Sequence, residues 1–180
     1  MLISLTGAQS TGKTTLLERC CKSNFFRNYH CVREVTRKVK REKLVDINEA
    51  GSNVTQLFIL NEHLNNHHLA NDTILDRCII DGIVYTEYLE SIGQVDYWVS
   101  IYAGHLFKEL IKKLDYVFYT DPADVKLVDD GERSMNIKFR EDIIERFDKW
   151  LDISSEYTNV IKVSGSVETR LNTVLQTVKS

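Results

Sequence analysis

The sequence predicts a single α/β domain that covers residues 1–180, with a five-stranded parallel sheet and helices on both faces. Short apolar segments that are typical of buried strands lie at residues 1–6, 29–32, 73–76, 115–120 and 159–163. Segments with helical spacing of apolar residues separate them. Strands that alternate with helices indicate a parallel sheet with right-handed crossovers. The single proline and the absence of low-complexity tracts indicate no domain boundary.

The first strand leads into a glycine loop that matches the phosphate-binding pattern G-x-x-x-x-G-K-T, the P-loop. The loop and the start of the following helix, expected at 14–22, contain Gly7, Ala8, Gln9, Ser10, Thr11, Gly12, Lys13, Thr14 and Thr15. Backbone N–H groups of such a loop, and the positive end of the helix dipole, point at phosphate oxygens. We expect Lys13 to reach the β- and γ-phosphates of ATP and the Thr14 hydroxyl to bind Mg²⁺. The alternative is a plain glycine turn that carries Lys-Thr.

A basic stretch, residues 33–43, follows the second strand. It contains Arg33, Arg37, Lys38, Lys40, Arg41 and Lys43, against Glu34 and Glu42. Charge runs of this kind usually form the solvated face of a helix. The second strand should deliver the stretch to the same sheet edge as the P-loop, so the alternative is a substrate-side patch that attracts an anion. Glu34 is a candidate to accept a proton from an attacking hydroxyl.

A further helix is expected to begin at Ser52, after a loop at 46–51. Its apolar stripe has the spacing of a core-facing helix and consists of Val54, Leu57, Phe58, Asn61 and Leu64. His67 and His68 near its end are adjacent, so they lack the four-residue spacing of a helical metal pair. We expect surface or capping histidines there.

The third strand ends in Asp76, which is followed by Arg77. An aspartate here can hold Mg²⁺ opposite Thr14, directly or through water, or it can cap the next helix, expected at 78–92. Arg77 is a candidate to bridge phosphates, or else a surface arginine. Asp81 is a second candidate proton acceptor, and the sequence does not decide between it and Glu34.

The polar segment after the fourth strand, residues 121–140, is expected to be a lid that carries Arg133, Lys138 and Arg140. Lid arginines neutralise the charge on a transferring phosphoryl group, and closure excludes water. We expect Arg133 to act in catalysis and Arg140 to bind the donor. The Asn-Lys-x-Asp sequence of GTPases is absent, which argues against a GTPase. The remaining helices are expected at 97–113, 137–151 and 167–178.

Charge and composition exclude several classes of protein. A net charge of −3 argues against general coating of nucleic acid but leaves local patches open. No apolar run approaches the roughly 20 residues that span a bilayer, so we expect no membrane partner. The apolar start is needed for the strand before the P-loop, so we do not expect it to be a cleaved signal peptide. The cysteines show no metal-type spacing, and we expect four reduced thiols in a cytoplasmic protein. They are Cys20, Cys21, Cys31 and Cys78.

Four segments together form a more specific pattern than the P-loop alone. Besides the P-loop they are Arg33-Glu34-Val35-Thr36-Arg37, Asp76-Arg77 with Asp81 and Tyr85, and Asp129-Asp130-Gly131-Glu132-Arg133-Ser134 with Arg140. With them the chain resembles the small P-loop kinases related to the ribosylnicotinamide kinase domain and to phage and bacterial nucleotide kinases of thymidylate-kinase-like shape. The resemblance covers nearly the whole chain. It implies a five-stranded parallel core, ATP as the donor, Mg²⁺, and a nucleoside or nucleotide acceptor. The residues that we expect to bind this acceptor are Glu34, Arg37, Arg77, Asp81 and Tyr85.

The basic stretch favours an acceptor that carries phosphate over a neutral nucleoside, so a deoxynucleoside monophosphate is the leading expectation. One alternative is a phage-type kinase that acts on a hydroxymethylpyrimidine within DNA, bound through the stretch from Arg33 to Lys43. A second is a ribosylnicotinamide or other nucleoside kinase. A third is a regulatory ATPase that transfers no phosphate to an acceptor. A homodimer is left open.

Overall fold

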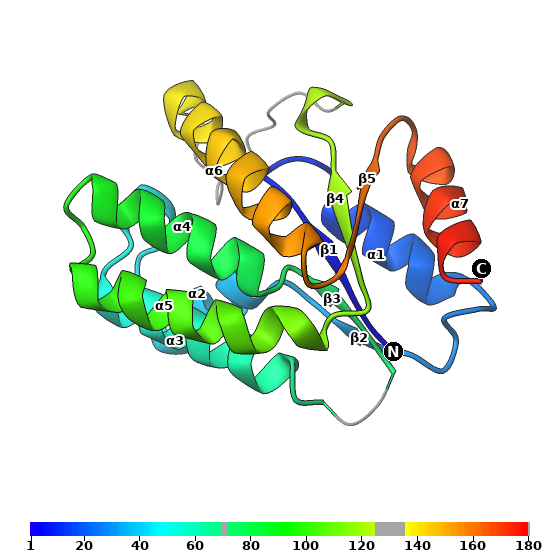
Figure 1. The fold of residues 1–180 in the computed structure, drawn as a ribbon, viewed down its shortest axis with the longest axis horizontal. Coiled ribbons are helices and arrows are strands. Elements are labelled where there is room, and N and C mark those ends of the chain that lie inside the picture. Colours follow the sequence, from blue (N-terminus) through cyan, green and yellow to red (C-terminus); the bar gives the residue numbers. More distant parts are fainter. Residues whose placement is uncertain (70–71, 125–135, 180) are drawn as a thin grey trace.

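The computed structural model describes residues 1–69, 72–124 and 136–179, and it confirms the predicted parallel sheet with helices on both faces. Among these residues the sheet has five parallel strands in the order β2-β3-β1-β4-β5 (Figure 1). The strands are β1 (Leu2–Thr6), β2 (His30–Val32), β3 (Thr73–Asp76), β4 (Tyr116–Thr120) and β5 (Asn159–Val163). In β1, Leu5 lies opposite Asp76 of β3 on one side and Phe118 of β4 on the other. The carboxyl ends of β1, β3 and β4 therefore meet at the P-loop.

The helices are α1 (Lys13–Lys22), α2 (Val35–Lys43), α3 (Asn53–Asn66), α4 (Ile79–Ser91), α5 (Tyr97–Leu110), α6 (Ile137–Ser155) and α7 (Val167–Thr177). Short 3-10 turns lie at Asn48–Ala50, Ile111–Lys113 and Pro122–Asp124. None of the helices within the described ranges has the length and apolar character needed to cross a membrane.

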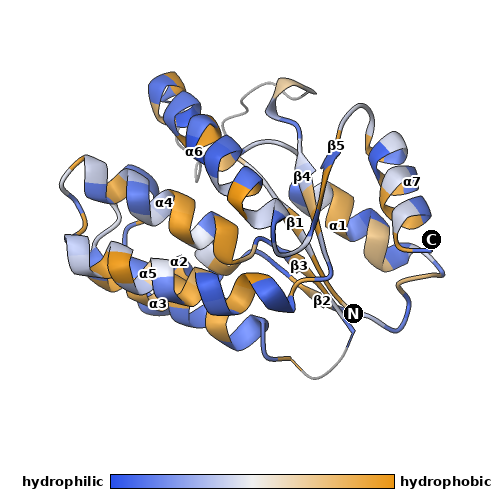
Figure 2. Ribbon diagram, viewed as in Figure 1, coloured by the Kyte–Doolittle hydropathy of each residue, from blue (hydrophilic) through white to orange (hydrophobic). Residues whose placement is uncertain are grey.

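The two faces of the sheet carry separate cores, because successive side chains of a strand point to opposite faces. Ile3, Leu5 and Phe118 pack against α1 and α7. Leu75 and Val117 pack on the other face, where α4, α5 and α6 lie. Figure 1 shows α1 and α7 together on one side and the remaining helices on the other. In Figure 2 hydrophobic residues gather in the strands and in α4, whereas α6 mixes hydrophobic and hydrophilic residues.

The basic stretch forms α2, and this helix is amphipathic. Val35 and Val39 are buried and pack against Ile59 of α3. The charged residues occupy the other side, where Lys38 Nζ lies 2.7 Å from Glu62 Oε2. The Lys43 ammonium lies over the Phe58 ring. Part of the positive charge is therefore already engaged by α3.

The predicted buried stripe of α3 is wrong. Val54 is 54% exposed and Asn61 is exposed, while Leu57, Phe58 and Leu64 are only partly buried. The buried side chains of this helix are Thr55, Gln56, Ile59, Leu60 and His63. His67, expected at the surface, is also buried and ends the helix, and its Nδ1 lies 2.7 Å from the His63 carbonyl oxygen. Polar residues occupy this face because part of it lines a pocket.

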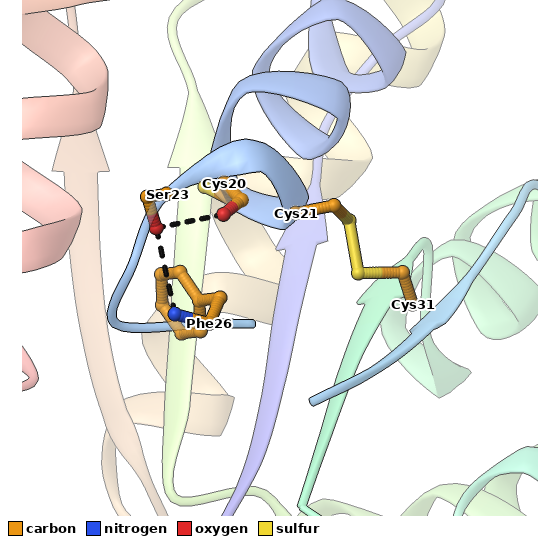
Figure 3. Close-up of a disulfide and its surroundings, with 5 residues drawn as sticks. All are labelled: Cys20, Cys21, Ser23, Phe26 and Cys31. Carbon is orange, nitrogen blue, oxygen red and sulfur yellow. Dashed lines mark hydrogen bonds between the residues drawn. A yellow bond between two sulfur atoms is a disulfide. The ribbon is translucent and has the colours of Figure 1, made fainter. Parts of the chain in front are cut away.

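The expectation of four reduced cysteines is wrong for two of them. Cys21, near the end of α1, forms a disulfide with Cys31 in β2 (Figure 3). The chain reverses after α1 at Ser23, whose N–H donates to the Cys20 carbonyl, and this turn returns it to the sheet edge beside the helix. Cys20 and Cys78 are free and buried, as expected for packing residues. Spacing along the sequence does not reveal that neighbouring elements bring Cys21 and Cys31 together.

Candidate functional site

The P-loop connects β1 to α1 and has a tightly constrained backbone. Gly7 has a φ of +139°, and a Cβ there would lie 2.8 Å from Thr120 Oγ1 of β4. The Thr120 hydroxyl in turn lies 2.6 Å from Thr11 Oγ1 and 3.1 Å from the Thr6 carbonyl oxygen. Thr120 of β4 therefore holds the loop against the sheet. The positive φ and the close approach of Thr120 leave room only for glycine at Gly7. This geometry supports the interpretation as a phosphate loop over a plain turn.

Lys13 lies inside the loop. Its Nζ donates to the carbonyl oxygens of Gly7 at 2.8 Å and Ala8 at 2.6 Å, and it lies 3.2 Å from Thr11 Oγ1. Lys13 is thus held by the loop's own carbonyl oxygens and is part of its packing. Burial, and then the charge of Arg77, lower the pKa of Lys13 from 10.5 to about 7. An anion held in the loop would favour the charged form, because it replaces the lost solvation of the ammonium group.

Thr14 and Asp76 meet at the start of α1. The Thr14 hydroxyl donates to Asp76 Oδ2 at 2.7 Å, and Asp76 is 1% exposed. Among the described residues, Asp76 Oδ1 is buried without a hydrogen-bond partner. Burial, and then the neighbouring Glu34 carboxylate, raise the pKa of Asp76. An unpaired carboxylate oxygen beside a hydroxyl fits the oxygen ligands that Mg²⁺ takes from protein when phosphates and water complete its shell.

Glu34, Arg77 and Asp81 form a connected group next to the loop. Arg77 Nε donates to Glu34 Oε1 at 2.8 Å, and Nη1 donates to Asp81 Oδ1 at 2.9 Å. Arg37 Nε lies 3.3 Å from Glu34 Oε2. Arg77 is only 8% exposed and has a φ of +80°, a strained value for a side-chain residue. The structure thus brings these four predicted residues together, and the two carboxylates hold much of the Arg77 guanidinium.

The two candidate proton acceptors differ in their surroundings. Asp81 is 2% exposed, and its Oδ2 accepts from the Thr6 hydroxyl at 2.6 Å and from the Cys78 N–H at 3.0 Å. With Arg77 on Oδ1, both of its oxygens are engaged, and it also caps α4. Burial alone would raise the pKa of Glu34, but the charges of Arg77, Lys13 and Arg37 lower it overall. Glu34 is therefore ionised and partly exposed, whereas the Asp81 carboxylate is buried and hydrogen-bonded through both oxygens.

A pocket opens beside this group, between the P-loop and the helices α2, α3 and α4. It is lined by Gln9, Glu34, Thr36, Arg37, Ile47, Asn48, Gln56, Ile59, His63, Arg77, Asp81, Gly82, Tyr85 and Leu89. Gln9 belongs to the P-loop itself, and Gln9 Oε1 accepts from the Tyr85 hydroxyl at 3.3 Å. Among the described residues, Gln9 Nε2 and His63 Nδ1 are buried without partners. Burial, then His67, lower the pKa of His63 well below 6.5, so the ring is neutral.

The remaining predicted residues lie farther out or outside the described part. Thr15 is exposed on α1, and Arg140 at the start of α6 donates through Nη2 to the Pro122 carbonyl at 2.9 Å. Arg133 lies outside the described residues, so its role stays a prediction. The sequence reasoning missed Gln56 and His63, which it placed off the buried face of α3. It also missed Thr120 and Arg170, whose contacts with the loop depend on the tertiary fold.

A family model for the AAA domain matches residues 2–170, from β1 to Arg170 in α7. The chain belongs to this family. Solved structures share the fold of this AAA domain. The deoxyadenosine kinase from M. mycoides with dCMP and dCDP is 14% identical, with a TM-score of 0.73 over 99% of this chain and 98% of that one. The thymidylate kinase from Candida albicans is 18% identical, with a TM-score of 0.68 over 99% and 90%.

The NadR protein in complex with NR is 20% identical to this AAA domain, with a TM-score of 0.73 over 98% of this chain and 50% of that chain. No curated protein matches the sequence. The likeness to these three proteins shows the shared fold. It confirms the resemblance to small P-loop nucleotide kinases that the sequence segments indicated.

Proposed function

We propose that this chain transfers the γ-phosphoryl group of ATP to a nucleotide or nucleoside acceptor, with a deoxynucleoside monophosphate as the leading candidate. The observation that carries this proposal is the pocket that begins at Gln9 of the P-loop and runs between α3 and α4. A pocket continuous with a phosphate loop places an acceptor within reach of the terminal phosphate of the donor. The kinase names of the structural neighbours support the same reaction class.

Each half of the site has a distinct task in this proposal. The loop N–H groups and Lys13 hold the donor phosphates, while Thr14 and Asp76 would hold Mg²⁺. When bound, Mg²⁺ neutralises negative charge on the β- and γ-phosphates. Glu34 accepts the hydrogen bond of the acceptor hydroxyl and orients it, and Arg77 and Arg37 fix the Glu34 carboxylate. A lid that includes Arg133 would supply further positive charge.

The inner end of the pocket suits a planar base. Gln56, His63 and Tyr85 line it, and the unpaired Gln9 Nε2 and His63 Nδ1 are available to hydrogen-bond a ligand. The cavity itself has a volume of about 50 Å³, which is room for a few water molecules and too little for a nucleoside. Acceptor binding therefore requires the outer wall to move, and this wall includes the exposed Arg37 and the turn at Asn48–Ala50.

Glu34→Gln is expected to lower turnover by about 10²-fold, because it removes a charged hydrogen-bond acceptor from the reacting hydroxyl. Asp81→Asn is the matching acid-to-amide variant at the other candidate proton acceptor. Since Asp81 caps α4 and accepts from Thr6 and Arg77, this variant should lose stability more than turnover. Steady-state rates and thermal melts of both variants check the assignment. The roles are reversed if Asp81→Asn folds normally and is the slower enzyme.

The acceptor is identified by a screen with labelled ATP against nucleosides, deoxynucleoside monophosphates and DNA that contains hydroxymethylpyrimidine. For a phosphate-bearing acceptor, Arg37→Ala should raise the acceptor KM about tenfold and leave that of ATP unchanged, because a charge-assisted bond is lost. Lys43→Ala, on the same helix but over Phe58, is the control. A neutral nucleoside as the best acceptor, with a KM unaffected by Arg37→Ala, would show that α2 is only a solvated face. Hydrolysis of ATP without any labelled acceptor would indicate the regulatory ATPase.

A DNA-borne acceptor is the second candidate, and a groove favours it. The groove has a volume of about 590 Å³, and it extends from Thr14 along the end of β2 to α2 and α3. It presents Arg33, Arg37, Lys38 and Arg41 together with Glu34, Glu42 and Glu62. Because the groove carries both positive and negative side chains, we expect it to bind a DNA strand weakly. Between about 50 and 200 mM salt, a DNA acceptor should lose orders of magnitude in affinity and a monophosphate only a modest amount.

We propose a cytoplasmic location and a homodimer as two further points to test. The Cys21–Cys31 disulfide argues against the cytoplasm, because that compartment is reducing, so alkylation of thiols in protein taken directly from cells decides the location. Both cysteines alkylated would support the cytoplasm, and both protected would reject it. For the dimer, the supporting observation is that Tyr97 and Trp98 of α5 are 69% and 53% exposed. Light scattering of the unaltered protein and of Trp98→Ala tests it, and a monomer at all concentrations would reject it.

A further inference from the structure

Arg170 on α7 is a buried cation that joins two loops of the site. It is 3% exposed. Its Nη1 donates to the Thr11 carbonyl oxygen at 2.5 Å, and its Nε donates to the Gly165 carbonyl oxygen at 3.0 Å. Burying an arginine is costly unless its donors find acceptors, and here backbone carbonyls of the P-loop and of the β5–α7 turn accept them. The contact links residues 159 positions apart in the sequence.

The bond to Thr11 fixes the orientation of one peptide group in the loop. The Thr11 carbonyl and the Gly12 N–H belong to the same planar, trans peptide, so they point in opposite directions. Because the carbonyl points at Arg170, the Gly12 N–H is directed away from α7. Gly12 has a φ of +81°, and glycine adopts both positive and negative φ at similar cost, so an external restraint on this peptide matters.

The direction of the first N–H groups of α1 also depends on how the Thr11–Gly12 peptide is oriented. Gly12 is the N-cap of α1, and no side chain caps the helix. The first N–H groups of a helix need partners, and in a phosphate loop the anion is that partner. Their direction follows from the Gly12 backbone, which Arg170 holds from outside: a Cβ at Gly12 would lie 3.5 Å from Arg170 Nη1.

We propose that Arg170 is a positioning residue for the donor phosphates, which it serves by holding the Thr11–Gly12 peptide with its N–H directed into the P-loop. This inference rests on the nucleotide binding proposed above. It assigns to α7 a role in phosphate binding, although Arg170 has no need to touch the nucleotide. The rival role is a purely structural one, in which Arg170 only fastens α7 to the rest of the fold.

The chain provides a matched control that tests the purely structural role. Arg19 of α1 forms an ion pair with Glu168 of α7, so it joins the same two helices. That pair is on the surface, where the Arg19 side chain is 51% exposed, and its bond is made to Glu168 and not to the P-loop. Arg19→Ala removes an arginine contact between α1 and α7 and leaves the Thr11 peptide untouched.

The test is binding of ATP and of inorganic tripolyphosphate, measured by calorimetry, for the unaltered protein, Arg170→Met, Arg170→Lys and Arg19→Ala. Arg170→Met keeps the apolar stem and removes the donors. Both ligands should bind about tenfold more weakly, because part of the charge-assisted bond that orients the Thr11–Gly12 peptide must then come from the ligand's binding free energy. Arg170→Lys keeps the charge without the planar fork and should recover part of the loss. Arg19→Ala should bind both ligands as the unaltered protein does.

Tripolyphosphate has no base, and this makes the outcomes distinct. A loss confined to ATP would overturn the proposal, because it would show that Arg170 affects binding of the nucleoside part of the ligand and not of the phosphates. Unchanged affinities together with a lower melting temperature would overturn it in favour of the structural role. If Arg170→Met does not fold, Arg170→Lys decides by the same criterion. Failure of the unaltered protein to bind either ligand would instead reject the nucleotide binding proposed above, and this inference with it.

Discussion

Lys13→Ala is expected to reduce phosphoryl transfer by at least about 10²-fold, because it removes the positive charge at the centre of the P-loop. The Lys13 ammonium already lies against the Gly7 and Ala8 carbonyls, so it needs little rearrangement to reach a bound phosphate chain. The variant should be measured by product formation at saturating acceptor. Its melting temperature should be recorded as well, since Lys13 makes three polar contacts within the loop.

The uptake of a proton on ATP binding gives a second test of the role of Lys13. With a pKa of about 7 in the free protein, Lys13 is mostly neutral at about pH 8. Phosphate favours its charged form, so ATP binding at that pH should take up a proton, and the uptake should fade as the pH falls below 7. Calorimetry in buffers of different ionisation enthalpy detects this uptake, which should vanish in Lys13→Ala. The exposed Lys22 at the far end of α1 serves as the control site. Activity above a few per cent in Lys13→Ala would contradict the assignment.

Much of the site could be predicted because it depends on local sequence and strand order. The P-loop motif determines Gly7, Lys13 and Thr14 within a single strand–loop–helix unit. The meeting of Thr14 and Asp76 follows from one further assumption, that β3 lies beside β1, and the observed pairing confirms it.

The parts that were missed depend on contacts that sequence spacing does not encode. Arg170 reaches the loop from the last helix, and the Cys21–Cys31 disulfide joins a helix to an edge strand. The error on α3 has a different cause: the sequence predicts a buried apolar stripe that includes Val54, yet Val54 is exposed while Gln56 and His63 are buried. Polar residues on a buried face violate the usual pattern, and such violations are expected where a helix lines a binding pocket.

Asp76→Asn is expected to reduce turnover by about 10²-fold and to raise the Mg²⁺ concentration needed for half-maximal rate. The reason is that an amide replaces the buried carboxylate that accepts from the Thr14 hydroxyl, while the size of the side chain is kept. Chelation with EDTA should abolish activity of the unaltered protein, and added Mg²⁺ or Mn²⁺ should restore it. Metal affinity should also fall as the pH is lowered through the raised pKa of Asp76, because only the ionised carboxylate binds the metal.

The control for this prediction lies near the other end of the same strand. Asp72 is exposed, and it pairs with the N-terminal ammonium group at the edge of the sheet away from the P-loop. Asp72→Asn should therefore leave the rate and its dependence on Mg²⁺ unchanged. Asp76→Asn also removes the free-energy cost of a buried, partly desolvated carboxyl group. In the absence of metal, this variant should therefore be at least as stable to unfolding as the unaltered protein. A slow but stable Asp76→Asn variant separates a metal ligand from a structural cap, whereas undiminished activity in EDTA would reject the metal site.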